Sequence, residues 1–365
     1  MVVWSEYTAR QADADRDRAL GLTETLTPRT VLVTGAAGVL GRALLERLRS
    51  EGASVRVMVR RPSRDLQEMA DVQQVHGDLG DPEAVDRAVA GVQVVYHLGA
   101  TMRGRGWAEY EAGTVRGTTN VVDSCLKHRV QRLVHVSSLS VLDYCRPIAR
   151  TVVDEGAALE PHPTKRGSYT RAKLLAERIV IDAWEQRGLP AVVVRPGQIV
   201  GPGYESVAPY GTIALGRRWV AIGSGRVKLP LVHVNDVVDG LLAAAMRADV
   251  AGSVYHLVSI QGMTQREYIT RCQQETDERL PVTYVPRIAI LAAAAGLDLV
   301  GTLLRRELPL SRYRVRSIKE LTFDCAAARQ DLGWTPSLRE VQLHDRADRA
   351  DAGELTGERQ RSQFG

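Results

Sequence analysis

Tyr169 and Lys173 are four residues apart in a segment with helical spacing, so both side chains would lie on one helix face. A lysine ammonium beside a phenol stabilises the phenolate and lowers the phenol's pKa, which suits proton exchange with an alcohol or ketone. Ser138 ends an upstream apolar run, where its hydroxyl could polarise the same carbonyl oxygen. Ser138 could also be a turn residue, and Ser137 competes for the role. We expect Ser138, Tyr169 and Lys173 to be catalytic.

A glycine-rich segment follows the first apolar run and precedes an amphipathic stretch. The spacing of Gly35, Gly38 and Gly41 is typical of a loop that lets the backbone approach a pyrophosphate. The N–H groups of the helix that begins at Val39 and Leu40 would point at the phosphates. This pattern predicts dinucleotide binding.

The elements that must position these residues alternate along the chain. Strands are predicted at 31–33, 54–59, 72–75, 92–98, 132–137 and 191–194. Long helices are predicted at 107–128 and 169–186, and Asp81 with Pro82 should cap and begin a shorter one. Strands that alternate with helices indicate an α/β fold with a doubly wound parallel sheet.

From about Gly201 the alternation weakens and glycines and prolines become frequent, as in loops that carry substrate recognition. A helix at 237–246 returns to the fold, and Thr264 with Glu267 has the form of a capping box. We expect a polar N-terminal extension at 1–28, a dinucleotide-binding domain at 29–200, a mainly substrate-binding α/β portion at 201–338 with some return to the first domain, and a polar tail at 339–365.

Composition narrows the function. The 365 residues are 44% hydrophobic, and 48 basic residues face 43 acidic ones, for a net charge of +5. This balance favours a solvated surface with some anion-binding sites over a nucleic-acid-binding surface. The four cysteines are scattered without a C-x-x-C pair, so neither a disulfide framework nor a metal site is indicated.

The polar beginning of the chain lacks the apolar core of a signal peptide, and we expect a cytoplasmic protein. The apolar run at 288–304 is interrupted by Gly296 and Asp298. This interruption favours a buried or amphipathic helix over a membrane span, and we do not expect membrane contact.

The ordered motifs resemble the extended short-chain dehydrogenase/reductase family, also called the epimerase/dehydratase family. The resemblance covers about 29–338 and rests on segments 34–41, 77–79, 97–100, 136–138, 169–173, 195–197, 201–203, 233–236 and 332–336. It implies a Rossmann-type fold and hydride transfer with a nicotinamide cofactor. Tyr169 would be the general acid/base, Lys173 would orient the nicotinamide ribose and tune Tyr169, and Ser138 would hold the substrate oxygen.

The cofactor contacts follow in the same way. The resemblance assigns the adenine to Asp78. The full set of expected cofactor contacts is Gly35, Gly38, Val39, Leu40, Gly41, Arg60, Asp78, Leu79, Leu98, Ala100, Lys173, Arg195 and Pro196.

Three positions depart from the family pattern. Arg60 and Arg61 stand where an acidic residue normally binds the ribose hydroxyls of NAD, and a cation there favours the 2′-phosphate of NADP(H). Thr114 replaces an asparagine, which puts a proton relay in doubt. Leu139 and Ser140 follow the catalytic hydroxyl, where dehydratases of the family carry acidic residues, so dehydration is disfavoured.

Two substrate classes share this chemistry. The segments 217–225 and 228–234 resemble nucleoside-diphosphate-sugar epimerases, and the cations there could neutralise a diphosphate. These cations are Arg217, Arg218, Arg226 and Lys228. Against this, Leu229 stands where sugar-nucleotide epimerases place an arginine. We favour a nucleotide-activated sugar that is epimerised or oxidoreduced at a ring carbon.

The alternative is an NADPH-dependent ketone reductase, like dihydroflavonol reductases or 3β-hydroxysteroid dehydrogenases. Arg60, Leu139 and the apolar run at 288–304 favour it. A non-catalytic dinucleotide-binding sensor is a third interpretation, against which the three catalytic candidates argue. By resemblance, the helices near 107–128 and 169–187 would pair with their copies in a homodimer.

Overall fold

The computed structural model describes residues 30–61, 66, 69–145, 152–204, 207–216, 218–276, 281–304 and 310–337. Within these residues a seven-stranded parallel sheet forms the centre, in the order β12-β7-β5-β4-β1-β2-β3. Its strands are β1 (Thr30–Thr34), β2 (Ser54–Val59), β3 (Val72–His76), β4 (Val94–His97), β5 (Arg132–Val136), β7 (Ala191–Pro196) and β12 (Val254–Leu257). This is the strand order of the dinucleotide-binding Rossmann fold with one strand added at an edge. The predicted fold class and all six predicted strands are confirmed.

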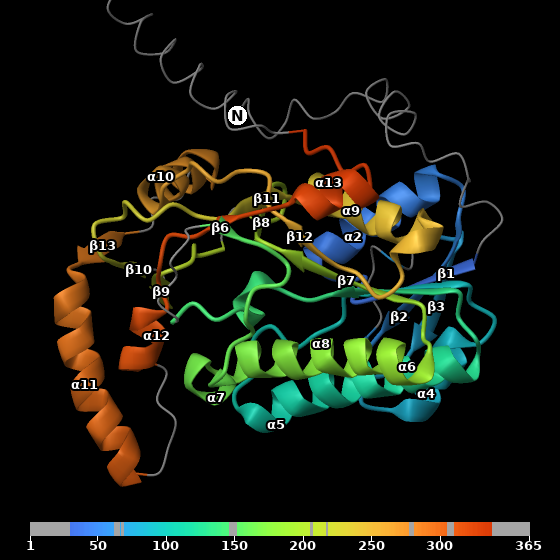
Figure 1. The fold of residues 1–365 in the computed structure, drawn as a ribbon, viewed down its shortest axis with the longest axis horizontal. Helices are drawn as coiled ribbons and strands as arrows, with labels where there is room; N and C mark the ends of the chain where they lie inside the picture. The colour runs from blue at the N-terminus through green and yellow to red at the C-terminus, as the bar shows by residue number, and fades with distance from the viewer. Residues whose placement is uncertain are drawn as a thin grey trace, which may run out of the picture.

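Helices cover both faces of the sheet (Figure 1). One face carries α4 (Pro82–Val89), α6 (Gly117–Lys127) and α8 (Ser168–Arg187), and the other carries α2 (Val39–Ser50) and α9 (Val234–Met246). Asp81 caps α4 by accepting hydrogen bonds from the N–H groups of Glu83 and Ala84, with Pro82 at the first helical position, as predicted. The predicted helix at 107–128 contains a π-helical turn, Glu111–Arg116, between α5 (Trp107–Tyr110) and α6.

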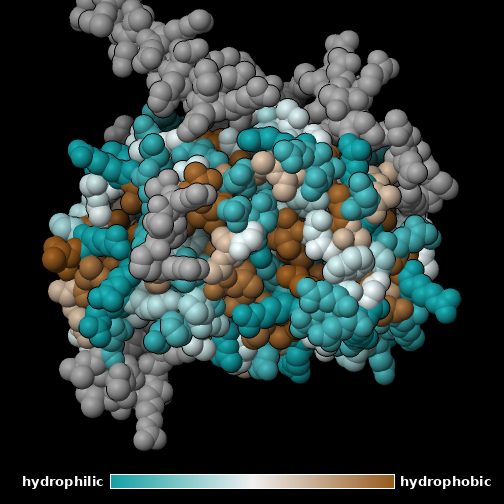
Figure 2. Space-filling view, in the orientation of Figure 1, coloured by the Kyte–Doolittle hydropathy of each residue, from teal (hydrophilic) through white to brown (hydrophobic). Residues whose placement is uncertain are grey.

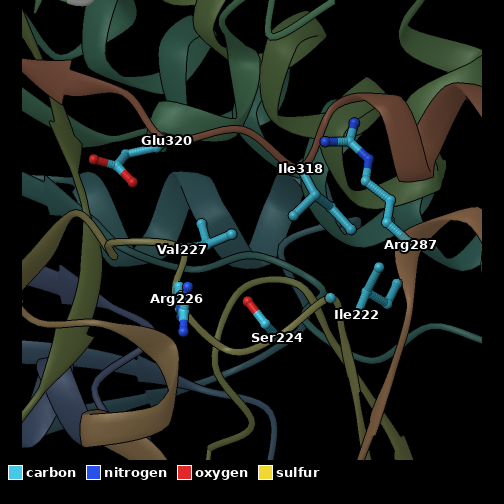
Figure 3. A pocket seen from close by; sticks show the side chains of 8 residues that line it. Ile222, Ser224, Arg226, Val227, Arg287, Ile318 and Glu320 are labelled. Carbon is cyan, nitrogen blue, oxygen red and sulfur yellow. The ribbon is translucent and has the colours of Figure 1, made fainter.

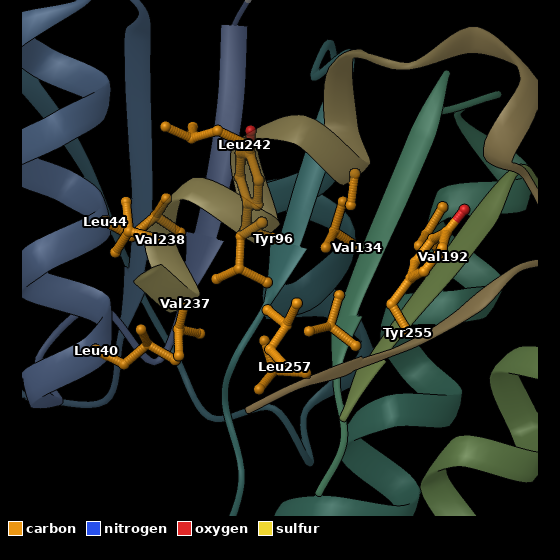
Figure 4. Packing of buried hydrophobic residues seen from close by; sticks show 14 of the residues in the cluster. Leu40, Leu44, Tyr96, Val134, Val192, Val237, Val238, Leu242, Tyr255 and Leu257 are labelled. Carbon is orange, nitrogen blue, oxygen red and sulfur yellow. The ribbon is translucent and has the colours of Figure 1, made fainter. Parts of the chain in front are cut away.

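The core between α2, α9 and the sheet is apolar (Figure 4). Leu40 and Leu44 of α2 meet side chains from α9 and from four strands. The side chains shown there include Val237, Val238, Leu242, Tyr96, Val134, Val192, Tyr255 and Leu257. Because both faces of the sheet are covered, the central strands β4, β5 and β7 are buried throughout, which explains their mainly apolar sequences.

The chain after Gly201 builds a smaller portion beside the sheet. It contains β9 (Thr212–Leu215), β10 (Arg218–Ile222) and β13 (Val282–Val285), which form a three-stranded sheet, and α10 (Gln265–Thr276), α11 (Arg287–Leu304) and α12 (Arg312–Arg316). Thr264 and Glu267 form the predicted capping box of α10. The strands were not predicted from the sequence.

Part of this region returns to the central fold. β11 (Leu231–His233) pairs with β8 (Gln198–Val200), α9 packs on α2, and β12 joins the central sheet beside β7. Trp334, in the closing motif of the family, is fully buried and donates a hydrogen bond from its indole to the carbonyl oxygen of Asp236. The expected extension at 1–28 and tail at 339–365 lie outside the described residues.

The apolar run at 288–304 lies in α11, whose N-terminal half is only partly covered. Ile288 is 79% exposed, so this part of α11 is not buried, and of the two expected forms the amphipathic helix fits it. Among the described residues, none of the helices is both long and apolar enough to cross a membrane. Hydrophilic and apolar side chains are mixed over the face in Figure 2, with apolar patches toward its middle.

Candidate functional site

The candidate site lies along one edge of the central sheet, because the carboxyl ends of parallel strands meet there. Five strands end one or two residues before predicted site residues. These residues are Gly35 after β1, Arg60 after β2, Asp78 just beyond β3, Leu98 after β4 and Ser138 just beyond β5; Pro196 is the last residue of β7. In open α/β sheets this edge is where ligands bind, at the point where the strand order reverses.

The glycine loop is shaped for close approach of another backbone group. Gly35 has φ +75°, and a Cβ there would lie 2.9 Å from the amide nitrogen of Gly99. A Cβ on Gly41 would lie 2.3 Å from the carbonyl oxygen of Gly35. Gly38 precedes α2 and offers no side-chain cap, so the first N–H groups of the helix face the loop. These features fit a pyrophosphate, which would be held by Gly38, Val39, Leu40 and Gly41.

A second loop covers this helix end, and sequence reasoning missed it. A Cβ on Gly203 would lie 2.8 Å from a methyl group of Val39, and the N–H of Leu40 donates a hydrogen bond to the Tyr204 hydroxyl. Burial raises the pKa of Tyr204 to about 12, with a contribution from Tyr169 nearby. Tyr204 therefore lies near both the predicted phosphate-binding turn and Tyr169, the predicted catalytic tyrosine.

The other predicted cofactor residues lie at the same edge. Asp78 accepts a hydrogen bond from the N–H of Gly80 at 2.8 Å, and its side chain is exposed. Leu79, Leu98 and Ala100 are partly exposed. The side chain of Arg60 is exposed, where an incoming group could reach it.

The two serines after β5 have different roles. Ser137 is buried and donates from its hydroxyl to Glu177 at 2.5 Å. Ser138 is partly exposed and forms a side-chain hydrogen bond with Tyr169. Its hydroxyl also accepts from the N–H of Ser140 at 3.2 Å. Of these two serines, only Ser138 therefore combines exposure with contact to Tyr169. Its catalytic role stays a prediction, which this geometry favours over that of Ser137.

Tyr169 and Lys173 lie on one face of α8, as the spacing predicts. Burial raises the pKa of Tyr169, and the hydrogen bond with Ser138 opposes that rise. The Lys173 ammonium donates to the carbonyl oxygen of Val136 at 2.7 Å. Burial lowers the pKa of Lys173 to about 8, and the charge of Glu177 opposes this shift. The expected stabilisation of a Tyr169 phenolate by Lys173 stays a prediction.

Arg195 was expected to contact the cofactor, but its guanidinium is committed inside the protein. It is 3% exposed and binds the Glu177 carboxylate through two nitrogens, at 2.6 and 3.1 Å. It also donates to the carbonyl oxygen of Glu155 at 3.2 Å. A cofactor contact through the main chain of Arg195, or through Pro196, stays a prediction.

Two buried histidines lie beneath the site on β4 and β5. His97 and His135 stack with ring centroids 5.3 Å apart. Burial lowers the pKa of His97 to about 3 and that of His135 well below its usual range, and the nearby charge of Lys173 adds to both shifts. Both rings are therefore neutral at physiological pH.

Thr114, which replaces the family asparagine, lies in the π-helical turn and is 2% exposed. Its hydroxyl accepts a hydrogen bond from the N–H of Thr101 at 2.9 Å. π-helical turns are frequent at functional sites. The Thr114 hydroxyl is thus hydrogen-bonded to the main chain, and its participation in a proton relay stays a prediction.

The cations proposed for a diphosphate are spread out. Arg217 lies outside the described residues, Arg218 is exposed, and Lys228 lies 3.9 Å from Glu320. Leu229 is 1% exposed within an apolar cluster.

Arg226 lines a cavity of about 260 Å³ in the C-terminal portion (Figure 3). The other side chains shown there belong to Ile222, Ser224, Val227, Arg287, Ile318 and Glu320. The cavity thus combines two arginines and one carboxylate with three aliphatic side chains.

The chain matches the NAD dependent epimerase/dehydratase family over residues 31–257. It is 32% identical to 4-hydroxy-2-methyl-3-oxo-4-farnesyl-3,4-dihydroquinoline-1-oxide ketoreductase of Stigmatella aurantiaca, over 85% of this chain and 93% of that protein. It is 30% identical to 2-alkyl-3-oxoalkanoate reductase of Stenotrophomonas maltophilia, over 84% of this chain and 95% of that protein. MoeE5, solved with UDP-glucose and NAD, has a TM-score of 0.65 and 25% identity over 85% of this chain and 94% of its own.

These similarities agree with the dinucleotide-binding edge, since they support a nicotinamide dinucleotide as the cofactor. The protein is thus an NAD(P)-dependent oxidoreductase or epimerase, and it belongs to the NAD dependent epimerase/dehydratase family.

Proposed function

We propose that this protein is an NADP(H)-dependent ketone reductase that interconverts a ketone and a secondary alcohol on a small, largely apolar substrate. One observation of the site carries this choice over a nucleotide-activated sugar. Leu229, at the position where sugar-nucleotide epimerases place an arginine, is buried among Val200, Leu231 and Ile260. It offers no charge to a diphosphate. The names of the two reductases at 30% and 32% identity support the same substrate class.

The protein's own groups would act on the substrate oxygen. Ser138 donates a hydrogen bond to the ketone, and Tyr169 transfers its proton to that oxygen during reduction and recovers one during oxidation. Lys173 supplies a positive charge that favours the phenolate formed in between. A bound nicotinamide supplies or accepts the hydride. Arg60 would bind the 2′-phosphate that distinguishes NADP(H) from NAD(H).

A nucleotide-activated sugar is the second candidate, with a specific observation in its favour. Arg226 lines the cavity in the C-terminal portion and would offer a positive charge to an anionic group. Arg287 also lines it, but its guanidinium donates to the carbonyl oxygens of Val315 and Arg316. MoeE5, a protein of similar fold, was solved with UDP-glucose. The two candidates differ in whether the substrate carries a diphosphate.

Turnover and thermal shift together test the proposal. NADPH consumption is measured with a panel of alkyl and cyclic ketones and with UDP- and dTDP-sugars, and the melting temperature is recorded with each ligand and NADP. A true substrate class raises the melting temperature with its concentration. Tyr169→Phe should reduce kcat by about 10²–10⁴-fold. Tyr255→Phe, which removes a hydroxyl bound to Asp331 away from the site, is the matched control. Stabilisation by sugar nucleotides alone would overturn the ketone assignment.

A further inference from the structure

Three side chains on one face of α8 reach three successive residues at the end of β5. They are separated by four positions each, which places them one helical turn apart. The pairs are Tyr169 with Ser138, Lys173 with Val136 and Glu177 with Ser137. The catalytic candidates are therefore only two of three links between this helix and this strand, and the third has no assigned role.

Glu177 is the most deeply enclosed member of the set. Its side chain is 0% exposed, and each of its oxygens has a partner. One oxygen accepts from Arg195 at 2.6 Å, and the other accepts from Arg195 at 3.1 Å and from Ser137 at 2.5 Å. A buried carboxylate held by a bidentate guanidinium keeps a fixed position and a negative charge. Glu177 thereby joins β5, β7 and α8 beneath the catalytic side chains.

The charges around Lys173 are few. From the neighbouring strands it faces His97 and His135, which are both neutral because burial lowers the pKa of each. Burial also lowers the pKa of Lys173 to about 8, and Glu177 opposes that shift. Among the described residues, Glu177 is the negatively charged group that raises the pKa of Lys173. Its partner Arg195 lies on the far strand, β7.

We infer that Glu177 is a positioning residue that fixes the end of β5 against α8 through Ser137 and compensates the charge of the Lys173 ammonium. This inference rests on the proposed function only in assigning hydride-transfer chemistry to Tyr169 and Lys173. Two effects follow. Loss of the Glu177 charge destabilises the ammonium, and loss of the hydrogen bond to Ser137 affects geometry alone.

The titration of Lys173 separates these effects without turnover. The chain has five lysines, so NMR of ¹³C-labelled lysine side chains, assigned with Lys173→Met, can follow each amine in the cofactor-free protein. Glu177→Gln should lower the pKa of Lys173 by about one unit, because an opposing charge nearby is lost. Ser137→Ala keeps the Glu177 carboxylate and should leave the pKa of Lys173 unchanged. An unchanged titration in Glu177→Gln, or an equal shift in Ser137→Ala, overturns the inference.

Glu177→Gln leaves Arg195 buried without its carboxylate and could fail to fold. The double variant Glu177→Gln with Arg195→Gln removes both buried charges and keeps two amides that can bond to each other. It should lower the pKa of Lys173 by less than Glu177→Gln does, because loss of the Arg195 cation acts in the opposite direction. An unchanged or raised pKa of Lys173 contradicts the inference.

In active enzyme, the alkaline limb of kcat/KM should move to lower pH by the same amount in these variants. If neither ketones nor sugar nucleotides are turned over, the proposed function fails, while the lysine titration still decides the role of Glu177.

Discussion

A Cβ placed on Gly41, in the first turn of α2, would lie 2.3 Å from the carbonyl oxygen of Gly35 and 2.7 Å from the Cα of Ala36. The glycine is therefore required by contact between the helix and its own preceding loop. Both neighbours are backbone atoms and cannot rotate away. Any larger residue must displace either the loop or the helix end, and the predicted pyrophosphate site consists of these two parts.

Gly41→Ala should weaken dinucleotide binding by at least about tenfold, because a shifted helix end no longer points its N–H groups at the phosphates. The dissociation constants of NADPH and NADH are measured by fluorescence titration. Gly106→Ala is the matched control, since its extended backbone, with φ −176°, accepts any residue and nothing lies within 4 Å of an added Cβ. Unchanged binding by Gly41→Ala would show that the cofactor does not use this turn.

Arg60 is expected to select the cofactor. Its guanidinium is exposed directly after β2, where a 2′-phosphate could accept charge-assisted hydrogen bonds. Arg60→Ala should raise the dissociation constant of NADPH by about 10–100-fold, corresponding to about 1.5–3 kcal/mol for such a bond, and leave that of NADH unaltered. Arg61→Ala tests the adjacent cation, and Arg87→Ala on α4 controls for general charge. Equal affinity of the unaltered protein for NADH and NADPH would contradict the expected role of Arg60 in selecting NADPH.

The central fold was predictable because its determinants are local. The central strands β1, β4 and β7 are mainly apolar runs, and β2 alternates apolar and polar residues. The cap at Asp81 and the capping box at Thr264 follow from side chains that bond to nearby N–H groups. The glycine spacing likewise predicts a turn whose constraint is the contact between Gly35 and Gly41.

The missed features depend on contacts between segments far apart in the chain. The bond between Tyr204 and Leu40 joins residues on different elements, and no local pattern indicates it. The pairing of Glu177 with Arg195 requires β7 to lie beside β5. The spacing of Glu177 four residues after Lys173 was visible and could have drawn attention to it. The exposed Ile288 is another feature that the sequence alone did not predict, because an apolar run does not show whether another segment covers it.

Buried histidines should make the protein sensitive to acid. Burial lowers the pKa of His97 and His256 to about 3 in the folded state, whereas an unfolded histidine titrates near 6.5. Between these values the unfolded chain binds protons that the folded protein does not, so the free energy of unfolding falls as the pH falls. Each such histidine contributes a slope of about 1.4 kcal/mol per pH unit. Urea denaturation from pH 7 to pH 4 measures this slope.

His135 provides a variant for the same measurement. Among the described residues, neither of its ring nitrogens has a hydrogen-bond partner, so an apolar replacement leaves no polar group unsatisfied. His135→Leu should reduce the slope of unfolding free energy against pH by about 1.4 kcal/mol per unit below pH 6.5. His76→Leu, at an exposed position at the end of β3, is the control for replacing a histidine by leucine. An identical slope in His135→Leu would mean that this histidine is already protonated when folded.

Trp334 should stabilise the fold well beyond what the polar sequence around it suggests. It is 0% exposed, packs in the main core and donates from its indole nitrogen to the carbonyl oxygen of Asp236 at 2.7 Å. Trp334→Ala should lower the free energy of unfolding by about 3–5 kcal/mol through the cavity it leaves. Trp334→Phe keeps most of the packing and should cost about 1–3 kcal/mol, from the lost indole hydrogen bond and the smaller ring. Thr335→Ala, at an exposed neighbouring position, should cost less than about 0.5 kcal/mol. Asp236 lies in the first turn of α9, which packs on α2, so Trp334→Ala should also weaken NADPH binding. Equal losses for Trp334→Ala and Thr335→Ala would assign the closing motif no structural role.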